Sequence, residues 1–303
     1  NFAEIDGVRD FLGNRTGFCK MNLNIKDIYS RFACGNAAVN GSWLSVTHSY
    51  FDTTGHDDYF DATALDEKLY RCFIPFNLVD GLETELVFYP IMPPANLQLT
   101  LQCFDDTGRR SAQITVTPCF DSASTQMERI NVRKLLHTNG IMDTKGLYCL
   151  QIEAENDRLP ARVTYGLNYS GKNPIGCNIS SSAYMAKSYE TGKRSYLWGP
   201  LMFRSGGRNL ILVSHFKKLK GDRSSSDFKV SLYGDDGIVA CENFRSPNGT
   251  CTNMEAEELL KTANYRPREN EVLWYVLESS DPSYVCSQIH ISADGFVGGD
   301  HSF

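Results

Sequence analysis

The side chains most able to bind a metal or to move a proton are concentrated between positions 48 and 61. This segment reads HSYFDTTGHDDYFD and holds two histidines and four aspartates. Imidazole nitrogens and carboxylate oxygens are common metal ligands. Their spacing here matches no metal motif, and the same composition is typical of an acidic linker, which we favour. The weak candidate ligands are His48, Asp52, His56, Asp57 and Asp58.

Two Asp-Asp pairs are the next candidates for binding a cation. Asp105-Asp106 and Asp235-Asp236 each stand shortly before a glycine. Clustered carboxylates bind Ca²⁺, but a calcium loop uses more ligands than one such pair supplies. Aspartate before glycine is also favoured in tight turns, so we interpret both pairs as hairpin turns. We therefore predict neither a metal site nor a cofactor.

Nucleophilic catalysis has no recognisable motif in this sequence. The Gly-x-Ser-x-Gly turn that presents a reactive serine is missing, and none of the six histidines has a signature context. The paired carboxylates of a glycoside hydrolase would come from distant strands and leave no local pattern. We predict no enzyme, and a secreted hydrolase is the least favoured alternative.

Composition narrows the class of protein. The 303 residues are 42% hydrophobic and 22% charged, which is enough apolar surface for a packed core. The net charge of -6 has the wrong sign for neutralising phosphates, so we do not expect nucleic acid as a partner. No apolar run approaches the roughly 18 residues that span a bilayer. The basic stretch HFKKLKGDR predicts a solvated hairpin, with binding of an acidic surface or a surface polysaccharide as the alternative.

Ten cysteines without a Cys-x-x-Cys pair predict disulfide bonds in an oxidising compartment. Cys241 and Cys251 flank ENFRSPNGT, whose Ser-Pro and Asn-Gly steps predict a chain reversal, so they are the best disulfide candidate. Cys19 and Cys34 are the next pair, across a short loop. The sequence leaves open the pairing of Cys72, Cys103, Cys119, Cys149, Cys177 and Cys286.

Two further features favour export from the cell. The chain begins at Asn1 rather than at methionine, which fits a mature product whose leader has been removed, or a trimmed piece. Five Asn-x-Ser/Thr triplets would accept glycans in a eukaryotic secretory route. They begin at Asn14, Asn40, Asn168, Asn178 and Asn248. We expect a secreted or cell-surface protein, extracellular or periplasmic, that is a glycoprotein if these triplets are used.

The strongest signal is an internal repeat. Six segments recur in the same order: LYRCFIPF with YLWGPLMF, ETELVFYP with RNLILVSH, LTLQCFDDTG with VSLYGDDG, MERINVRKLL with MEAEELLK, GLYCLQIE with EVLWYVLE, and ARVTYGLNYS with SQIHISADG. Their alternation of apolar and polar residues predicts half-buried strands. The helical candidates are single turns, the best being Asn253 to Lys261 with Asn253 as its cap.

This repeat predicts an all-β fold with two tandem antiparallel β-sandwich modules of immunoglobulin-like size. We place an N-terminal half module and linker at 1–60, the first sandwich at 61–172, a linker at 173–194 and the second sandwich at 195–303. Trp43 and Trp274 fall at equivalent strand positions, which we expect to face the core.

The first 60 residues repeat only the second half of a module. Met21 precedes Trp43 by 22 residues, much as Met127 precedes Tyr148 by 21. Half a sandwich leaves strand edges open and an apolar face uncovered, which a neighbouring subunit could complete. These strands could also extend the first sandwich, cap the groove between the sandwiches, or be the remainder of a longer array.

Together these features favour an extracellular structural or interaction protein. It would be a repeat subunit of a surface assembly or filament, completed by copies of itself through the N-terminal half module. The alternative is a carbohydrate- or ligand-binding sandwich protein that uses some of its 15 tyrosines and three tryptophans. The state of assembly in solution separates these two hypotheses.

Overall fold

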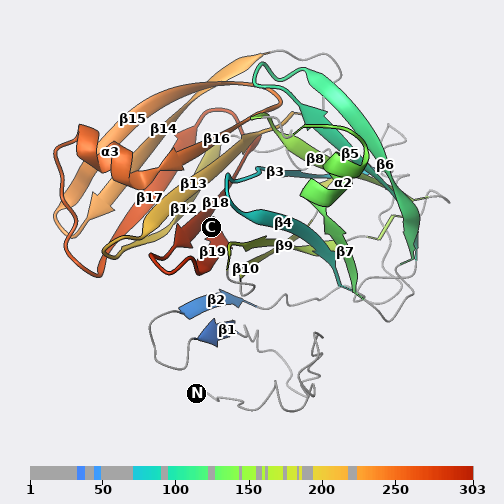
Figure 1. Ribbon diagram of the computed structural model, residues 1–303. Coiled ribbons are helices and arrows are strands. Elements are labelled where there is room, and N and C mark those ends of the chain that lie inside the picture. Colours follow the sequence, from blue (N-terminus) through green and yellow to red (C-terminus); the bar gives the residue numbers. More distant parts are fainter. Residues whose placement is uncertain are drawn as a thin grey trace, which may run out of the picture.

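The computed structural model describes residues 33–37, 44–48, 71–89, 95–121, 127–142, 145–154, 159–160, 163–172, 176–182, 184–185, 194–217 and 224–302. Over these ranges the protein consists mostly of antiparallel strands with two short helices, which confirms the predicted all-β sandwich class. Neither of these helices is long and apolar enough to cross a membrane. The strands after residue 70 form two groups that lie side by side, green and orange in Figure 1.

The first group forms two antiparallel sheets. The β3 sheet has the strand order β11-β3-β8-β5-β6, and the β4 sheet has the order β10-β9-β4-β7. Helix α2 (Val132–Thr138) follows β7, and its cap Asn131 accepts a hydrogen bond from the Lys134 backbone N–H. The strands are β3 (Arg71–Phe76), β4 (Glu83–Phe88), β5 (Asn96–Phe104), β6 (Arg110–Asp121), β7 (Glu128–Asn131), β8 (Tyr148–Ala154), β9 (Thr164–Ser170), β10 (Cys177–Ser182) and β11 (Tyr184–Met185).

The second group forms another two antiparallel sheets. The β12 sheet has the order β12-β17-β14-β15, and the β13 sheet has the order β16-β13-β18-β19. Helix α3 (Ala256–Thr262) follows β16, and its N-cap is Glu255 rather than the expected Asn253. The strands are β12 (Ser195–Phe203), β13 (Arg208–His215), β14 (Ser225–Gly234), β15 (Gly237–Pro247), β16 (Thr250–Glu255), β17 (Glu271–Ser279), β18 (Tyr284–Ile291) and β19 (Val297–His301).

The six matched segments occupy equivalent places in the two groups, although the strand register puts Ile130, and not Met127, at the position of Met254. The order β3-β8-β5-β6 corresponds to β12-β17-β14-β15, and β9-β4-β7 corresponds to β18-β13-β16. The repeat in the sequence is therefore also a repeat of strand order. The range 173–194, which we expected to be a linker, contains β10 and β11, and these strands pair with β9 and β3. The other boundaries stay a prediction.

Alternation along the strands builds a core inside the second sandwich. On β17 the side chains of Leu273, Tyr275 and Leu277 face inward and are buried. They pack in one cluster with Ile211 and Val213 of β13, from the opposite sheet. Full burial of one such aliphatic side chain stabilises the fold by about 1.5–3 kcal/mol. The equivalent core of the first sandwich lies between the β3 and β4 sheets.

The β13 sheet is packed on both of its faces. Ile211 and Val213 belong to the core of the second sandwich, whereas Leu210 and Leu212 belong to the cluster of the first. A strand that is buried on both faces needs apolar residues at successive positions, and β13 accordingly reads RNLILVSH. The β13 sheet therefore separates two apolar clusters and contributes side chains to both.

Asn77 joins the two sandwiches by hydrogen bonds. Its Nδ2 donates to Asn253 Oδ1 at 2.7 Å and to the Val213 carbonyl at 3.3 Å, and its Oδ1 accepts from Ser214 Oγ at 2.5 Å. Its own carbonyl accepts from the Tyr169 hydroxyl at 2.7 Å. A buried polar network with its partners in place fixes the relative position of the elements it joins. Asn253 does not cap α3 because it lies within β16, which continues to Glu255.

The N-terminal strands form a separate hairpin. Strand β1 (Ala33–Ala37) pairs with β2 (Leu44–His48), and β2 lies beside β10 of one sandwich and β19 of the other (Figure 1). Among the described strands this hairpin forms a two-stranded sheet of its own. Its position agrees with the hypothesis of a cap over the groove between the sandwiches. Met21 and Trp43, on which the half module was based, lie outside the described residues.

Candidate interaction surface

The outer face of the β12 sheet carries a group of exposed aromatic and aliphatic side chains. Side chains on β12 alternate, so that Leu201 and Phe203 enter the core while the residues between them point outward. On the neighbouring strand β17, Val272 and Trp274 point outward in the same way. We name this surface the aromatic face. It consists of Tyr196, Trp198, Pro200, Met202, Val272 and Trp274.

The two tryptophans of the aromatic face lie next to each other. Their ring centroids are 5.6 Å apart and their planes are tilted by 54°. The guanidinium carbon of Arg194 lies 5.9 Å from the centroid of the Tyr196 ring, within the range of a cation–π contact. Rigid aromatic side chains offer a large contact area at a low cost in conformational entropy, and a contiguous exposed apolar patch marks an interaction site.

Trp274 corrects a prediction made from the sequence. We expected it in the core, but it is 44% exposed, and its neighbours Leu273 and Tyr275 are the buried residues. The strand reads EVLWYVLES, with large apolar residues on both of its faces, so alternation alone does not show which face is inward. The pairing of β17 with its neighbours determines which of its faces is buried. The equivalent residue Trp43 lies outside the described part of the chain.

Polar groups border the aromatic face. The Lys229 ammonium lies 2.6 Å from the Glu278 carboxylate, and this hydrogen bond raises the pKa of Lys229. Further along the same sheet, Ser231 Oγ lies 3.5 Å from Cys241 Sγ. An apolar centre with a polar rim is the usual composition of a protein–protein contact.

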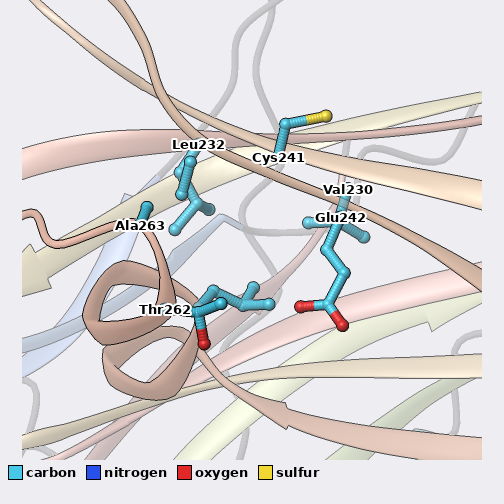
Figure 2. A pocket seen from close by; sticks show the side chains of 8 residues that line it. Val230, Leu232, Cys241, Glu242, Thr262 and Ala263 are labelled. Atoms are coloured by element: carbon cyan, nitrogen blue, oxygen red, sulfur yellow. The ribbon is translucent and has the colours of Figure 1, made fainter.

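A cavity of about 350 Å³ lies between α3 and the strands β14 and β15. Its apolar lining includes Val230, Leu232 and Leu259. Figure 2 shows Glu242 and Thr262 as its polar side chains, with Cys241 pointing away from them. One carboxylate and one hydroxyl do not make a catalytic arrangement, so we do not treat this cavity as the functional site.

A buried polar cluster surrounds His215, at the end of β13. Asp281 Oδ2 lies 3.3 Å from His215 Nε2 and 2.5 Å from Lys217 Nζ. The Ser226 hydroxyl lies 3.4 Å from the same ring nitrogen, and the Tyr284 ring stacks on the imidazole at 4.5 Å. Burial lowers the pKa of His215. Sequence analysis gave no sign of this cluster, because its members are far apart along the chain.

The geometry of this cluster does not fit a Ser-His-Asp triad. A triad places the serine and the carboxylate at opposite ring nitrogens of the histidine. Here Ser226 and Asp281 both face Nε2 of His215, while Nδ1 lies 3.0 Å from the Ser246 carbonyl and donates its proton to it. The histidine is also fully buried. The cluster therefore holds the end of the second sandwich together.

The candidate metal ligands are not brought together in the part of the chain that the structure describes. His48 belongs to β2, and the other members of its segment lie outside the described residues: Asp52, His56, Asp57 and Asp58. Within the described ranges no three His, Cys, Asp or Glu residues form a metal-binding group.

The Asp-Asp pairs lie in the tight turns between paired strands. Oδ1 of Asp105 accepts hydrogen bonds from the backbone N–H groups of Thr107 and Arg109 and from the Thr107 hydroxyl. The Thr107 hydroxyl and the Arg109 amide lower the pKa of Asp105. Asp235 and Asp236 occupy the equivalent turn between β14 and β15.

Seven of the described cysteines carry free thiols: Cys72, Cys103, Cys149, Cys177, Cys241, Cys251 and Cys286. The proposed Cys241–Cys251 bond is wrong for a structural reason. The segment between them is not a loop, because β15 continues to Pro247 and the turn is confined to residues 248–249. Cys241 lies six residues before that end, about 20 Å along an extended strand, whereas a disulfide needs Cα atoms within about 7 Å. Cys19 lies outside the described residues, so its pairing with Cys34 stays a prediction.

The glycosylation candidates differ in their surroundings. Asn248 is buried, and its Nδ2, the atom that would carry a glycan, donates to the Lys217 carbonyl at 3.2 Å. A glycan there would require this turn to open. Asn168 and Asn178 stand opposite each other in β9 and β10, and Asn14 and Asn40 lie outside the described residues.

Of the basic stretch HFKKLKGDR, His215 and Lys217 belong to the buried cluster around Asp281, so Lys217 is not part of a solvated hairpin. Lys218, Lys220 and Arg223 lie outside the described residues.

Comparison with known proteins adds no family to this picture. No protein-family model matches the sequence, and no curated protein matches it.

Proposed function

We propose that this chain is a structural or interaction protein and that a partner protein docks on its aromatic face. The observation that carries this proposal is the exposure of two adjacent tryptophans, 38% for Trp198 and 44% for Trp274, on a sheet whose other face is a packed core. Aromatic side chains at the centre of a contact provide most of its binding energy once a partner excludes water from them.

The strand arrangement adds a second support. Among the described strands, β12 has one neighbour, β17, so it stands at an edge of its sheet. Pro200 lacks an amide hydrogen, and proline is accepted on an edge strand, where it limits uncontrolled strand addition. A partner would therefore bind chiefly through side chains of the aromatic face rather than by extending the ladder along all of β12.

An extracellular setting remains part of the proposal. It is supported by the glycan-acceptor triplets other than the one at Asn248, whereas the free thiols of the structure give it no support. A surface assembly or filament is the form of function that best suits a repeated sandwich with an exposed apolar face.

Sedimentation velocity over a range of concentrations tests this function. We expect the unaltered protein to associate and the double variant Trp198→Ser, Trp274→Ser to lose association by at least tenfold. Met142→Ser is the matched control, because Met142 is 84% exposed on the first sandwich, away from the aromatic face. Equal association of all three proteins would contradict the proposal, as would a strict monomer at millimolar concentration.

Carbohydrate binding is the second candidate function. The position of Trp274 favours it, because a core residue could not touch a sugar, whereas Tyr196, Trp198 and Trp274 are all exposed on one face. Affinity electrophoresis in gels that contain soluble polysaccharides tests this candidate. Retardation of the unaltered protein but not of the double tryptophan variant would support it over protein docking.

A further inference from the structure

The aromatic face has an equivalent surface on the first sandwich. Pro75 stands opposite Cys149 in the pairing of β3 with β8, just as Pro200 stands opposite Trp274 in the pairing of β12 with β17. Counting along the strands from these pairs makes Phe73 the equivalent of Trp198. In the same way, Leu147 is the equivalent of Val272.

The second sandwich covers this equivalent surface. Phe216, which follows β13, places its ring 5.5 Å from the ring of Phe73 and 5.9 Å from that of Phe104. Phe73 is only 5% exposed and Cys149 is fully buried, and both belong to one apolar cluster with Phe216.

Polar contacts accompany this apolar cluster. Cys251 Sγ donates to the Gly146 carbonyl at 3.2 Å, and Asn253 Nδ2 donates to the Leu78 carbonyl at 2.8 Å. Both donors lie on β16 of the second sandwich. The end of the second sandwich is thus docked on the outer face of the β3 sheet.

The two equivalent faces therefore differ in what covers them. On the first sandwich this face is an interface, whereas on the second Trp198 and Trp274 stand at the positions of Phe73 and Cys149 and remain exposed. The edges differ as well, because β11 pairs with β3 while β12 has only β17 beside it among the described strands.

We propose that a second copy of this chain docks on the aromatic face, head to tail, in the way that the second sandwich docks on the first. This inference rests on the proposed function, since it names the partner for the same face. Two different surfaces meet in such a contact, so in a pair one copy keeps its docking end unused and the other keeps its aromatic face unused. The contact then propagates into a fibre unless its rotation closes a ring.

The strand register indicates which end of the incoming copy makes the contact. Its Phe216 is already buried within its own chain, so the first sandwich must supply the docking end. Ile130 stands opposite Leu86 as Met254 stands opposite Ile211, which makes Met127 the equivalent of Cys251. By the same count Arg129 is the equivalent of Asn253, and its side chain is 43% exposed. The start of β7 is therefore the surface that we assign to the contact.

Two complementary variants of the full chain test this assignment. The face variant is Trp274→Glu, and the end variant is Met127→Glu; Met142→Glu is the control. The introduced charges are alike, so the altered surfaces cannot attract each other. We expect each variant alone to sediment as a monomer, and an equimolar mixture to form a one-to-one dimer through the intact face of one and the intact end of the other.

The outcomes separate the inference from the function on which it rests. If the end variant associates as strongly as the unaltered protein while the face variant does not, the aromatic face binds a partner but the head-to-tail contact is wrong. If the unaltered protein stays monomeric at millimolar concentration, both fail. Thermal melting checks that each variant is folded, and Arg129→Glu replaces Met127→Glu if the latter unfolds.

Discussion

Asp281 is held at the end of the second sandwich by groups from several segments. Burial raises the pKa of Asp281, but the hydrogen bonds from Lys217 and from the Ser283 hydroxyl and amide outweigh this effect and lower the pKa to about 2. Burial lowers the pKa of the neighbouring His215 from its ordinary value of 6.5. Both shifts favour the deprotonated side chain in the folded protein, so each contributes stability at neutral pH.

We therefore expect stability to fall with acid in two steps. The contribution of His215 is present above pH 6.5 and is lost as the pH falls through its lowered folded pKa. The contribution of Asp281 is present above pH 3.8, its unfolded pKa, and is lost as the pH falls from 3.8 to about 2, its folded pKa. Urea unfolding from pH 8 to 2.5 measures both. In Asp281→Asn the second step should become smaller, and the remainder belongs to other carboxylates with a lowered pKa, such as Asp105. An unchanged step below pH 4 would contradict the role of Asp281.

The cysteines give a second test at the level of single residues. Burial raises the pKa of Cys103 to about 11 and of Cys177 and Cys251 to about 12, so these thiols should react slowly in the folded protein. Cys241 is exposed. We expect a thiol reagent at pH 8 to modify Cys241 at least tenfold faster than these three, as measured by peptide mass spectrometry. Complete protection of Cys241 in the monomer would contradict its placement.

At the scale of the strand, β17 shows what sequence alternation can and cannot reveal. Its type, length and place in the repeat were predicted from the sequence, because turn residues bound it and its partner segment recurs. The face of β17 that points inward was not predicted, because Trp274 and Val276 are as apolar as Leu273 and Tyr275. The hydrophobic pattern fixes the register only where one face is polar.

Two adjacent substitutions on β17 check this assignment. Leu273→Ala removes a fully buried side chain from the second core and should lower the free energy of unfolding by about 2–5 kcal/mol. Trp274→Ala removes a larger but exposed side chain and should cost about 1 kcal/mol or less in the monomer. Urea unfolding at low protein concentration measures both. The reverse ranking would return Trp274 to the core.

At the scale of the whole molecule, the sequence predicted the two similar halves but not how they join. Asn77 lies just after a predicted strand, and nothing in its neighbourhood indicates a contact with residues more than 130 positions away. The packing of the β13 sheet against both sandwiches left one trace in the sequence, the continuous apolar run of β13, which is also compatible with an ordinary buried strand. The aromatic face needed the register between β12 and β17, which a single sequence does not contain.

Because the β13 sheet contributes to the apolar clusters of both sandwiches, we expect the sandwiches to unfold together. Asn77→Ala leaves the Ser214 hydroxyl and the Asn253 amide without their buried partner and should lower the free energy of unfolding by about 2–4 kcal/mol. Asn96→Ala, at an exposed strand end, is the matched control. Calorimetry should show one transition that shifts as a whole. Two transitions, of which only one shifts, would mean that the halves are independent.

Burial of β13 on both faces also determines how the chain can vary. A strand with one wet face accepts substitutions at every second position, and β12 should show this period of two in a saturation mutagenesis screen. From Leu210 to Val213 every side chain is buried, so all four positions should be intolerant of substitution in the same screen. During divergence of the two repeats this segment could therefore change only in concert with the first sandwich. We therefore expect the contact between the halves to restrict sequence change in this protein more than the core of either half does.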